Sequence, residues 1–346
     1  MKIKFILLKI FFTVVSPIVL NAQDIHFSQF WMAPLTQNPA LAGANHDLQA
    51  IVNYKDQWRS VASPYKTFDI SFDMKLNRKK TTKGFCAGGI NFFADKAGDA
   101  QLGTTQGNLN FAYHVFLNNH NTLGGGIMGG FGQRSINYSE LQWLNQYDGT
   151  SYNSALSSGE PTTGANFTYT DLGAGLVWVY KKKEAYISGN DQVNAAAGLS
   201  VFHINRPGYS FYNTGEKLNM KIVAHGNVLY GIKNTNVSIV PGFVFYSQGS
   251  SNEILLGTLF RYTLKEASKI TGNIKGSGFA LGIHYRNKDA AITSAMIEIG
   301  QLTFGFSYDI NLSGLKQASN GRGGAEISVR FVNHNPFLYQ SKAKFD

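Results

Sequence analysis

Hydrophobic and polar side chains alternate along most of this chain with a period of two residues. One segment near the C-terminus has an apolar face made of Leu302, Phe304, Phe306, Tyr308, Ile310 and Leu312. Its other face carries small or polar residues, namely Thr303, Gly305, Ser307, Asp309 and Asn311. Successive side chains of a β-strand point to opposite faces, and the repeat of a helix does not produce such a run. The pattern predicts a strand with one apolar and one hydrated face.

The same alternation recurs in about fourteen segments, an even number as in bacterial outer-membrane barrels. The predicted strands are residues 47–55, 66–75, 85–94, 102–117, 122–133, 169–180, 192–203, 218–230, 236–246, 253–263, 277–287, 290–299, 302–312 and 325–331. In the last of them, Glu326, Ser328 and Arg330 share the polar face. A charged side chain on the lipid face near mid-bilayer costs ~2–4 kcal/mol, so this sorting favours lipid outside and water inside. The sequence therefore predicts an all-β protein, a transmembrane antiparallel β-barrel.

Three places fit the pattern less well. Pro241 lies within the ninth predicted strand, and because proline cannot donate a ladder hydrogen bond we expect a bulge there. Leu255 and Leu259 would face the interior, so either an interior plug covers them or the register is wrong at that strand. The glycine-rich run 124–132 lacks the Gly-Lys-Ser/Thr ending of a phosphate loop. It predicts instead a strand beside a crowded lumen, where small residues let another segment approach.

The first residues resemble a secretory signal. Lys2, Lys4 and Lys9 precede a largely apolar run from Ile10 to Leu20, and Leu20-Asn21-Ala22 offers a small residue for cleavage before Gln23. The alternative is an uncleaved anchor, but the run falls short of the ~20 residues that a spanning helix needs. Residues 1–22 are thus predicted to be a signal peptide. The single cysteine, Cys86, excludes an intrachain disulfide and lies far from the cleavage point, so no lipid-attachment cysteine follows the signal.

Composition supports a membrane barrel over a soluble sandwich. Charged residues make up 15% of the chain, aromatic residues 13%, and the mean hydropathy is −0.15. Soluble domains carry about 25% charged residues, whereas a barrel can lack them because its outer band faces lipid.

The segment 23–46 differs from the rest because it is neither a strand nor a long helix. Phe27, Phe30, Trp31, Met32 and Leu35 crowd around two prolines. One interpretation is an unstructured leader before the barrel, residues 47–331. The other is a segment that folds against the inner wall or the periplasmic mouth, because exposed apolar patches usually have a partner. Residues 332–346 are predicted to form a periplasmic tail.

Connection lengths predict the orientation. An even strand count places both chain ends on one side, and we expect both in the periplasm. The long connections 134–168 and 204–217 then lie outside the cell, while the short ones 118–121 and 300–301 lie in the periplasm.

Several short motifs, in a fixed order, resemble one family. The opening ones are Phe27-Ser28-Gln29-Phe30, Asn38-Pro39-Ala40-Leu41-Ala42-Gly43, Asp56-Gln57-Trp58, Pro64-Tyr65-Lys66-Thr67-Phe68 and Ser71-Phe72-Asp73. The closing ones are Phe306-Ser307-Tyr308-Asp309, Leu312-Ser313-Gly314-Leu315 and Glu326-Ile327. Together they are similar to the PorP/SprF family of type IX secretion proteins. Two positions depart from the family pattern: Lys55 stands where arginine is common, and Ala325 where histidine is frequent.

The resemblance implies an outer-membrane barrel that is not an enzyme. Such proteins take part in secreting, or retaining at the surface, adhesin-type cargo that carries a C-terminal signal domain, and some support gliding motility. They associate with periplasmic components, including a peptidoglycan-binding lipoprotein. We expect contact with outer-membrane lipid, and no cofactor, metal or nucleic-acid partner.

Candidate partner-binding residues fall in three groups. The motif residues are Phe27, Phe30, Trp31, Asn38, Pro39 and Trp58. Basic residues gather in predicted periplasmic segments, among them Lys181, Lys182 and Lys183, where they either flank lipid headgroups or dock an acidic partner. The connection 134–168 carries Trp143 and Tyr147 with few charges, which suits either contact with cargo or a lid over the pore.

Other function classes receive less support. Eight histidines lack metal-ligand spacing, and no G-x-S-x-G elbow is present. His114, His203, His225 and His284 are therefore interpreted as lumen or interface residues, and no catalytic residue is assigned. The competing functions are a general porin or solute transporter, and an outer-membrane lipase or protease.

Overall fold

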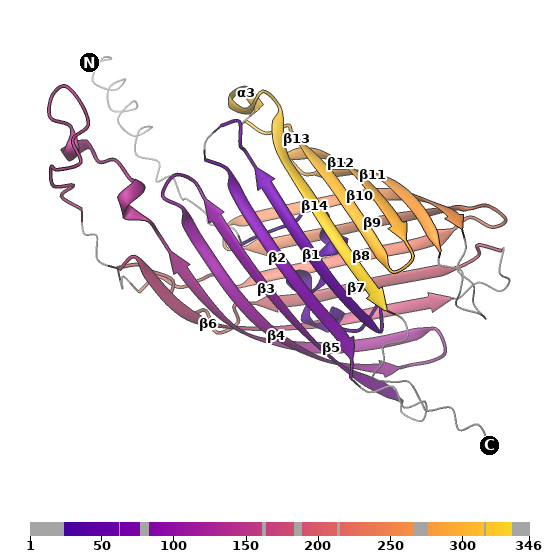
Figure 1. Cartoon of the computed structure of the whole chain (residues 1–346). Helices are drawn as coiled ribbons and strands as arrows, with labels where there is room; N and C mark the ends of the chain where they lie inside the picture. The colour runs from indigo at the N-terminus through magenta and orange to yellow at the C-terminus, as the bar shows by residue number, and fades with distance from the viewer. Residues whose placement is uncertain are drawn as a thin grey trace, which may run out of the picture.

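The computed structural model describes residues 24–61, 63–76, 83–160, 164–182, 189–212, 215–265, 276–314 and 316–333. Within these residues, fourteen antiparallel strands pair in chain order, and β1 pairs with β14 to close the barrel (Figure 1). The predicted fold class is confirmed. The predicted signal peptide, Lys183 and most of the predicted tail lie outside the described residues.

The strands follow the predicted segments closely. They are β1 (Leu48–Gln57), β2 (Tyr65–Lys75), β3 (Gly84–Ala97), β4 (Leu102–Phe116), β5 (Asn121–Ser135), β6 (Asn166–Lys182), β7 (Val193–Phe202), β8 (Lys221–Gly231), β9 (Val237–Gln248), β10 (Ser251–Lys265), β11 (Ser277–Arg286), β12 (Ala290–Ile299), β13 (Leu302–Asn311) and β14 (Arg322–Asn333). The largest differences are at the ends, as in β3, which continues to Ala97 because its backbone still pairs with β4 after the alternation stops. Backbone pairing does not require the apolar pattern that a lipid-facing segment needs.

The two faces of the wall sort as predicted. Outward side chains are apolar and exposed, as with Leu109 and Ile283 at 69% and 66%. Inward side chains are polar or small and buried, as with His114, Ser307 and Asp309. This is the arrangement expected for lipid outside and a polar interior.

The prediction of a β-bulge at Pro241 is wrong. In the pairing of β9 with β10, Pro241 stands opposite Thr258 without a change of register. With β8, the register is the same at Asn227 and at Tyr230, although the two pairs between them are interrupted. The proline therefore removes ladder hydrogen bonds locally but does not insert an extra residue.

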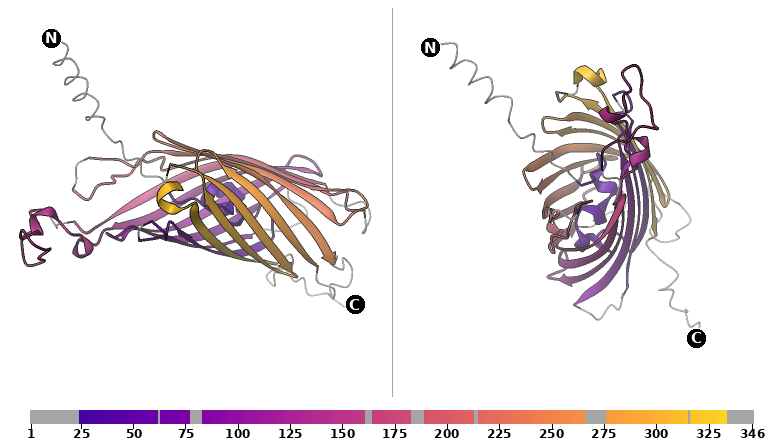
Figure 2. Two further views of the ribbon diagram at one scale, coloured as in Figure 1. Left: turned by 90° about the horizontal axis from the view of Figure 1, so that it is seen from above. Right: turned by 90° about the vertical axis from the view of Figure 1, so that its left-hand side faces the viewer.

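The two mouths of the barrel differ in their connections. The long-loop mouth carries the connections 136–165 and 203–220, and the first of these projects beyond the strands (Figures 1 and 2). The short-turn mouth carries the connections 117–120 and 300–301 and the end of β14 at Asn333. Outer-membrane barrels have long loops outside the cell and short turns in the periplasm, so the long-loop mouth is assigned to the cell exterior.

Residues Asp24–His46, which we call the lumenal segment, run through the interior of the barrel. In Figure 2 the indigo residues of this segment lie inside the ring of strands. At one end Asp24 contacts His203 and Lys221 at the long-loop mouth, and at the other Asn45 contacts Lys181 at the short-turn mouth. The expectation that both ends lie in the periplasm is therefore wrong for Asp24, because the chain crosses the lumen before β1 begins.

The helices of the described residues are short. The lumenal segment contains η1 (Phe30–Met32), α2 (Pro34–Gln37) and η2 (Pro39–Leu41), and the connection before β14 contains α3 (Lys316–Ser319). None of the helices in the described part of the chain is long and apolar enough to cross a membrane.

Candidate functional site inside the barrel

The lumenal segment is shaped by its prolines and by one asparagine. Pro34 and Pro39 occupy the first turns of α2 and η2, where the missing N–H costs nothing because it has no partner within the helix. The Asn38 side chain accepts a hydrogen bond from the Ala40 backbone N–H at 2.9 Å and caps η2. The segment thus breaks into single turns that can follow the inner wall.

A carboxylate on β14 holds the start of the segment. Glu326, which is buried, accepts hydrogen bonds from the backbone N–H groups of Ser28 at 2.8 Å and Gln29 at 2.9 Å. The Gln29 side chain donates to the Glu326 carbonyl and accepts from Ser328. A buried donor or acceptor left without its partner costs ~1–3 kcal/mol, so this set of hydrogen bonds is a strong anchor.

A buried ion pair extends the anchor. Arg286 donates to Asp309 at 2.9 Å and to the Ser28 hydroxyl at 2.6 Å, and that hydroxyl donates to Asp309 at 2.8 Å. Lys55 donates to the His26 carbonyl at 3.0 Å. Buried charges are costly unless they are paired and hydrogen-bonded. The wall therefore depends on the lumenal segment to satisfy several of its charged side chains.

Aromatic side chains of the segment cover the apolar part of the wall. Phe30 packs in a buried cluster that includes Val244 and Leu255. Trp31 stacks on His284 with ring centroids 4.7 Å apart and packs against Leu259. The segment thus covers both inward leucines, which confirms the alternative of an interior plug over an error in register.

Glycines let the segment approach the wall in the middle of the barrel. A Cβ at Gly126 would lie 2.5 Å from the Ala40 nitrogen, and one at Gly175 would lie 2.1 Å from the Asn38 side-chain oxygen. The Asn38 amide donates to the Leu176 carbonyl on β6 and lies 3.1 Å from His225 Nε2. The glycine run is therefore where the wall admits another segment, as the sequence predicted.

Further contacts hold the segment at the short-turn mouth. The Asp73 carboxylate accepts from the Gly43 backbone N–H at 2.8 Å and from Gln49 at 2.7 Å. His114 Nε2 lies 2.9 Å from the Ala42 carbonyl. Lys181 donates to the carbonyls of Ala44 at 2.9 Å and Asn45 at 3.1 Å.

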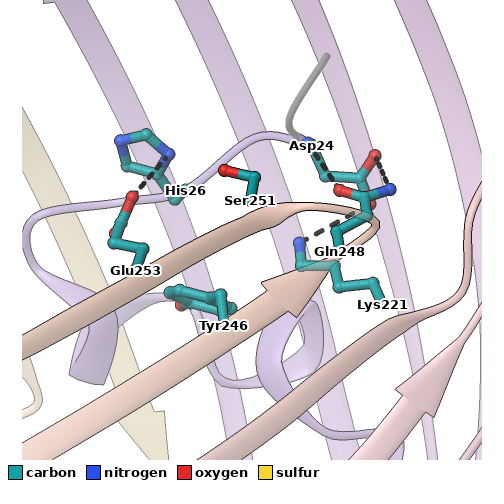
Figure 3. Close-up of a pocket in the computed structure, with 7 residues that line it drawn as sticks. All are labelled: Asp24, His26, Lys221, Tyr246, Gln248, Ser251 and Glu253. Carbon is teal, nitrogen blue, oxygen red and sulfur yellow. Dashed lines mark hydrogen bonds and ion pairs between the residues drawn. The ribbon is translucent and has the colours of Figure 1, made fainter. Parts of the chain in front are cut away.

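Ionic contacts hold the segment at the long-loop mouth. Asp24 lies 2.6 Å from His203 Nε2. It also lies 3.6 Å from Lys221 Nζ, and its backbone N–H donates to Gln248 at 3.0 Å (Figure 3). Asp171 accepts from the other ring nitrogen of His203 at 2.9 Å. Burial disfavours charge on His203, but the two carboxylates outweigh it and raise the pKa of His203 to about 9. Burial likewise opposes ionisation of Asp24, yet His203 and Lys221 lower its pKa well below the usual range.

The predicted site residues divide between the lumen and the mouths. Phe27, Phe30, Asn38 and Pro39 are buried in the lumen, and Trp31 is partly buried there. Trp58 instead follows the last residue of β1 at the long-loop mouth, with a positive φ of 60°, and packs edge-on against Tyr65. These residues contact other parts of the same chain.

The remaining candidates lie at the two mouths. Trp143 and Tyr147 belong to the connection 136–165, where Tyr147 is 55% exposed. Lys181 binds the lumenal segment, whereas Lys182 lies 3.7 Å from Asp191 with its side chain 45% exposed. The structure therefore separates two neighbouring lysines that the sequence grouped together.

Sequence reasoning missed the charged residues that hold the segment. Arg286, Asp309 and Glu326 are inward-facing charges close to the long-loop ends of their strands. Their position on the polar face was readable from the alternation, but their pairing with Ser28 and Gln29 spans almost the whole chain and leaves no local signal.

The four inward histidines contact the lumenal segment or the wall. His114, His203, His225 and His284 lie against Ala42, Asp24, Asn38 and Trp31, respectively. Among the described residues, no group of three or more His, Cys, Asp and Glu side chains is placed to hold a metal ion. The site binds a polypeptide segment of the same chain.

Comparisons with known proteins bear on the family and on the fold. A family model described as "Type IX secretion system membrane protein PorP/SprF" matches residues 19–331. No curated protein matches the chain.

Several solved outer-membrane structures are similar at low identity. The CymD monoaromatic hydrocarbon channel is 10% identical, with 88% of this chain and 93% of that chain covered and a TM-score of 0.42. The β-domain of the Bordetella autotransporter Brka is 12% identical, with 82% and 98% covered and a TM-score of 0.37. BamA from Haemophilus ducreyi, without POTRA domains 1–3, is 8% identical, with 83% and 71% covered and a TM-score of 0.40.

The close approach at Gly126 yields a test. In Gly126→Val the new side chain would overlap Pro39 and Ala40, so we expect a loss of ~1–3 kcal/mol of stability from overpacking and displacement of the lumenal segment. The measurements are the thermal midpoint of the purified barrel in detergent and protease cleavage between residues 24 and 46. Gly129→Val is the matched control, because a Cβ there meets no atom within 4 Å. Equal behaviour of the two variants would contradict the packing described here.

The contact at Asp24 predicts a pH dependence. Because the pKa of His203 is raised to about 9, its stabilising contribution is complete below its ordinary pKa and is lost as the pH rises through about 9. We expect hydrogen exchange at residues 24–30, corrected for its intrinsic pH dependence, to increase across that range. His203→Asn, which tolerates the local φ of 57°, removes the titrating group. The assignment fails if this variant keeps the same step.

Proposed function

This chain belongs to the PorP/SprF family of type IX secretion system membrane proteins, and we propose that within that system it binds secreted cargo on one side of the membrane and periplasmic partners on the other. It is a multi-pass β-barrel of the cell outer membrane. The proposed cargo comprises adhesin-type proteins with C-terminal signal domains, and the proposed periplasmic partners include a peptidoglycan-binding lipoprotein. The expected outcome is secretion, surface attachment or gliding motility, with no catalytic step in this chain.

The occupied lumen is the observation that carries the proposal. The lumenal segment runs from Asp24 at the long-loop mouth to Ala44 and Asn45, which Lys181 binds at the short-turn mouth, and its hydrogen bonds and aromatic packing occupy the interior between them. A diffusion pore needs a continuous water-filled path, whereas a partner-binding barrel needs only rigid mouths. The architecture therefore favours the binding role over the alternative of a general porin or solute transporter.

The long-loop mouth offers an apolar surface for cargo. In the connection 136–165, which projects from the barrel (Figure 1), Leu144 is 89% exposed and Tyr147 is 55% exposed. Residues 136–160 of this connection are held by their own contacts, including a β-bridge between Tyr147 and Tyr152 and the 3-10 turns η3 (Tyr138–Glu140) and η4 (Leu144–Gln146). Exposed aromatics on an ordered loop give contact area at a low entropic cost, which supports cargo contact over a lid.

The short-turn mouth offers a charged surface for a periplasmic partner. Lys182 is half exposed beside Asp191, while Lys181 is engaged with the lumenal segment. We therefore narrow the proposed docking role from the lysine cluster to Lys182, since a residue that holds the segment cannot be exchanged without disturbing the barrel.

Affinity capture from gentle detergent tests the two contacts separately. The double variant Trp143→Ala/Tyr147→Ala should reduce recovery of secreted cargo by about tenfold or more, since buried interface aromatics contribute ~2 kcal/mol or more each, and should leave periplasmic partners unchanged. Lys182→Glu should instead reduce recovery of the periplasmic partners and leave recovery of secreted cargo unchanged, so each variant serves as the control for the other. Unchanged recovery of both partner classes in both variants would remove the proposal.

Conductance separates the binding role from the porin. We expect the wild-type chain in planar bilayers to show little steady current, because the lumenal segment blocks the interior. A variant that lacks residues 25–40 should conduct in large, stable steps if it closes as a barrel, which heat-modifiable migration would verify. Large, stable steps from the wild-type protein would instead favour the pore.

A further inference from the structure

A cavity lies at the short-turn mouth between the lumenal segment and the wall. Its volume is about 480 Å³, and strands β6 to β12 and β14 contribute lining residues near their short-turn ends. Pockets of ~300–1,000 Å³ are the size that holds small ligands. None of the contacts proposed above for cargo or for Lys182 uses this cavity.

The cavity carries an excess of positive charge on one side. Arg261 makes a two-pronged contact with Glu298, in which its Nε lies 2.9 Å and its Nη2 2.6 Å from Oε2. Arg330 lines the same cavity, and its Nε is buried without a hydrogen-bond partner among the described residues. Two guanidinium groups thus face one carboxylate. The planar guanidinium fork matches a carboxylate or phosphate group, so an anion would complete the cluster.

The remaining lining favours a peptide over a simple anion or a fatty acid. An apolar face formed by Trp31, Leu259 and Met296 can receive one side chain. Two side-chain amides line the cavity as well, those of Asn194 and Asn227, whereas the Gln37 amide that also lines it already donates to the Phe30 and Ala33 carbonyls. Amides pair with the N–H and C=O groups of a peptide backbone, whereas an alkyl chain would bury them without partners at a cost.

We propose that this cavity binds a short peptide through a carboxylate. The carboxylate lies against Arg330, the neighbouring apolar side chain lies against Trp31, and the backbone pairs with the amides. A partner enters from the periplasm, because the cavity opens at the short-turn mouth. The inference stands on the cavity alone and does not depend on the proposed binding of cargo.

Calorimetric titration of the full chain in detergent tests the site. The probes are the acetylated peptide Ala-Ala-Phe-Ala with a free C-terminal carboxylate, its C-terminal amide, and the amidated peptide Ala-Asp-Phe-Ala, whose carboxylate is on a side chain. We expect at least one carboxylate peptide to bind and the uncharged amide to bind about tenfold or more weaker. The two carboxylate arms show whether a chain terminus or an acidic side chain is recognised.

Matched variants connect the binding to the cavity. Arg330→Gln should weaken the binding of the carboxylate peptide by about tenfold and leave the affinity for the amide peptide unchanged. Arg322→Gln is the control, because Arg322 lies on the same strand but is exposed at the long-loop mouth. Heat-modifiable migration shows that each variant is folded. The proposal is overturned if neither carboxylate peptide binds, if Arg330→Gln binds as the wild type does, or if decanoate binds and the peptides do not.

Discussion

The interior of this barrel depends on hydrogen bonds that satisfy buried ionisable side chains where water is excluded. Glu326 illustrates the constraint, because its carboxylate is satisfied by two backbone N–H groups of the lumenal segment. Arg286 and Asp309 bind each other and Ser28 in a similar way, and Arg286 also donates to Asp289. Removal of the segment would leave these side chains to water or to one another. The wall and the segment are therefore parts of a single folded unit.

The same contacts reinforce the place where the barrel closes. In the pairing of β1 with β14, Lys55 stands opposite Glu326. Lys55 also donates to the His26 carbonyl, while Glu326 accepts from the backbone N–H groups of Ser28 and Gln29, two and three positions further along the segment. The first and last strands are thus joined by their ladder and again by the segment that crosses them inside. The departure from arginine at position 55 is accommodated because the partner is a single carbonyl, which an ammonium group satisfies as well as a planar fork does.

The sequence predicted what local physics decides. Alternation located the strands and their lipid face, and the inward Leu255 and Leu259 indicated either an interior plug or an error in register, because apolar residues on a polar face need cover. The sequence could not predict the contacts that long-range packing decides. The contact between Ser28 and Glu326 spans 298 positions, and the passage of the chain to Asp24 at the long-loop mouth leaves no periodic trace. Trp58 and Tyr147 are aromatic like the residues buried in the lumen, and residue type alone did not distinguish them. In the structure Trp58 packs on Tyr65 and Tyr147 is exposed.

The two ends of the lumenal segment are held by different physics, and this sets the order in which it could leave the barrel. At the long-loop mouth the Asp24 side chain is 25% exposed and is held mainly by ionic contacts, which water and salt weaken. From Ser28 onward the segment is held by buried hydrogen bonds to charges, and near Asn38 by glycines that let the two backbones touch. Loss of the first contact leaves every later one intact, whereas loss of the Glu326 contact exposes the charges beneath it. Displacement that begins at Asp24 therefore costs less than displacement that begins in the middle.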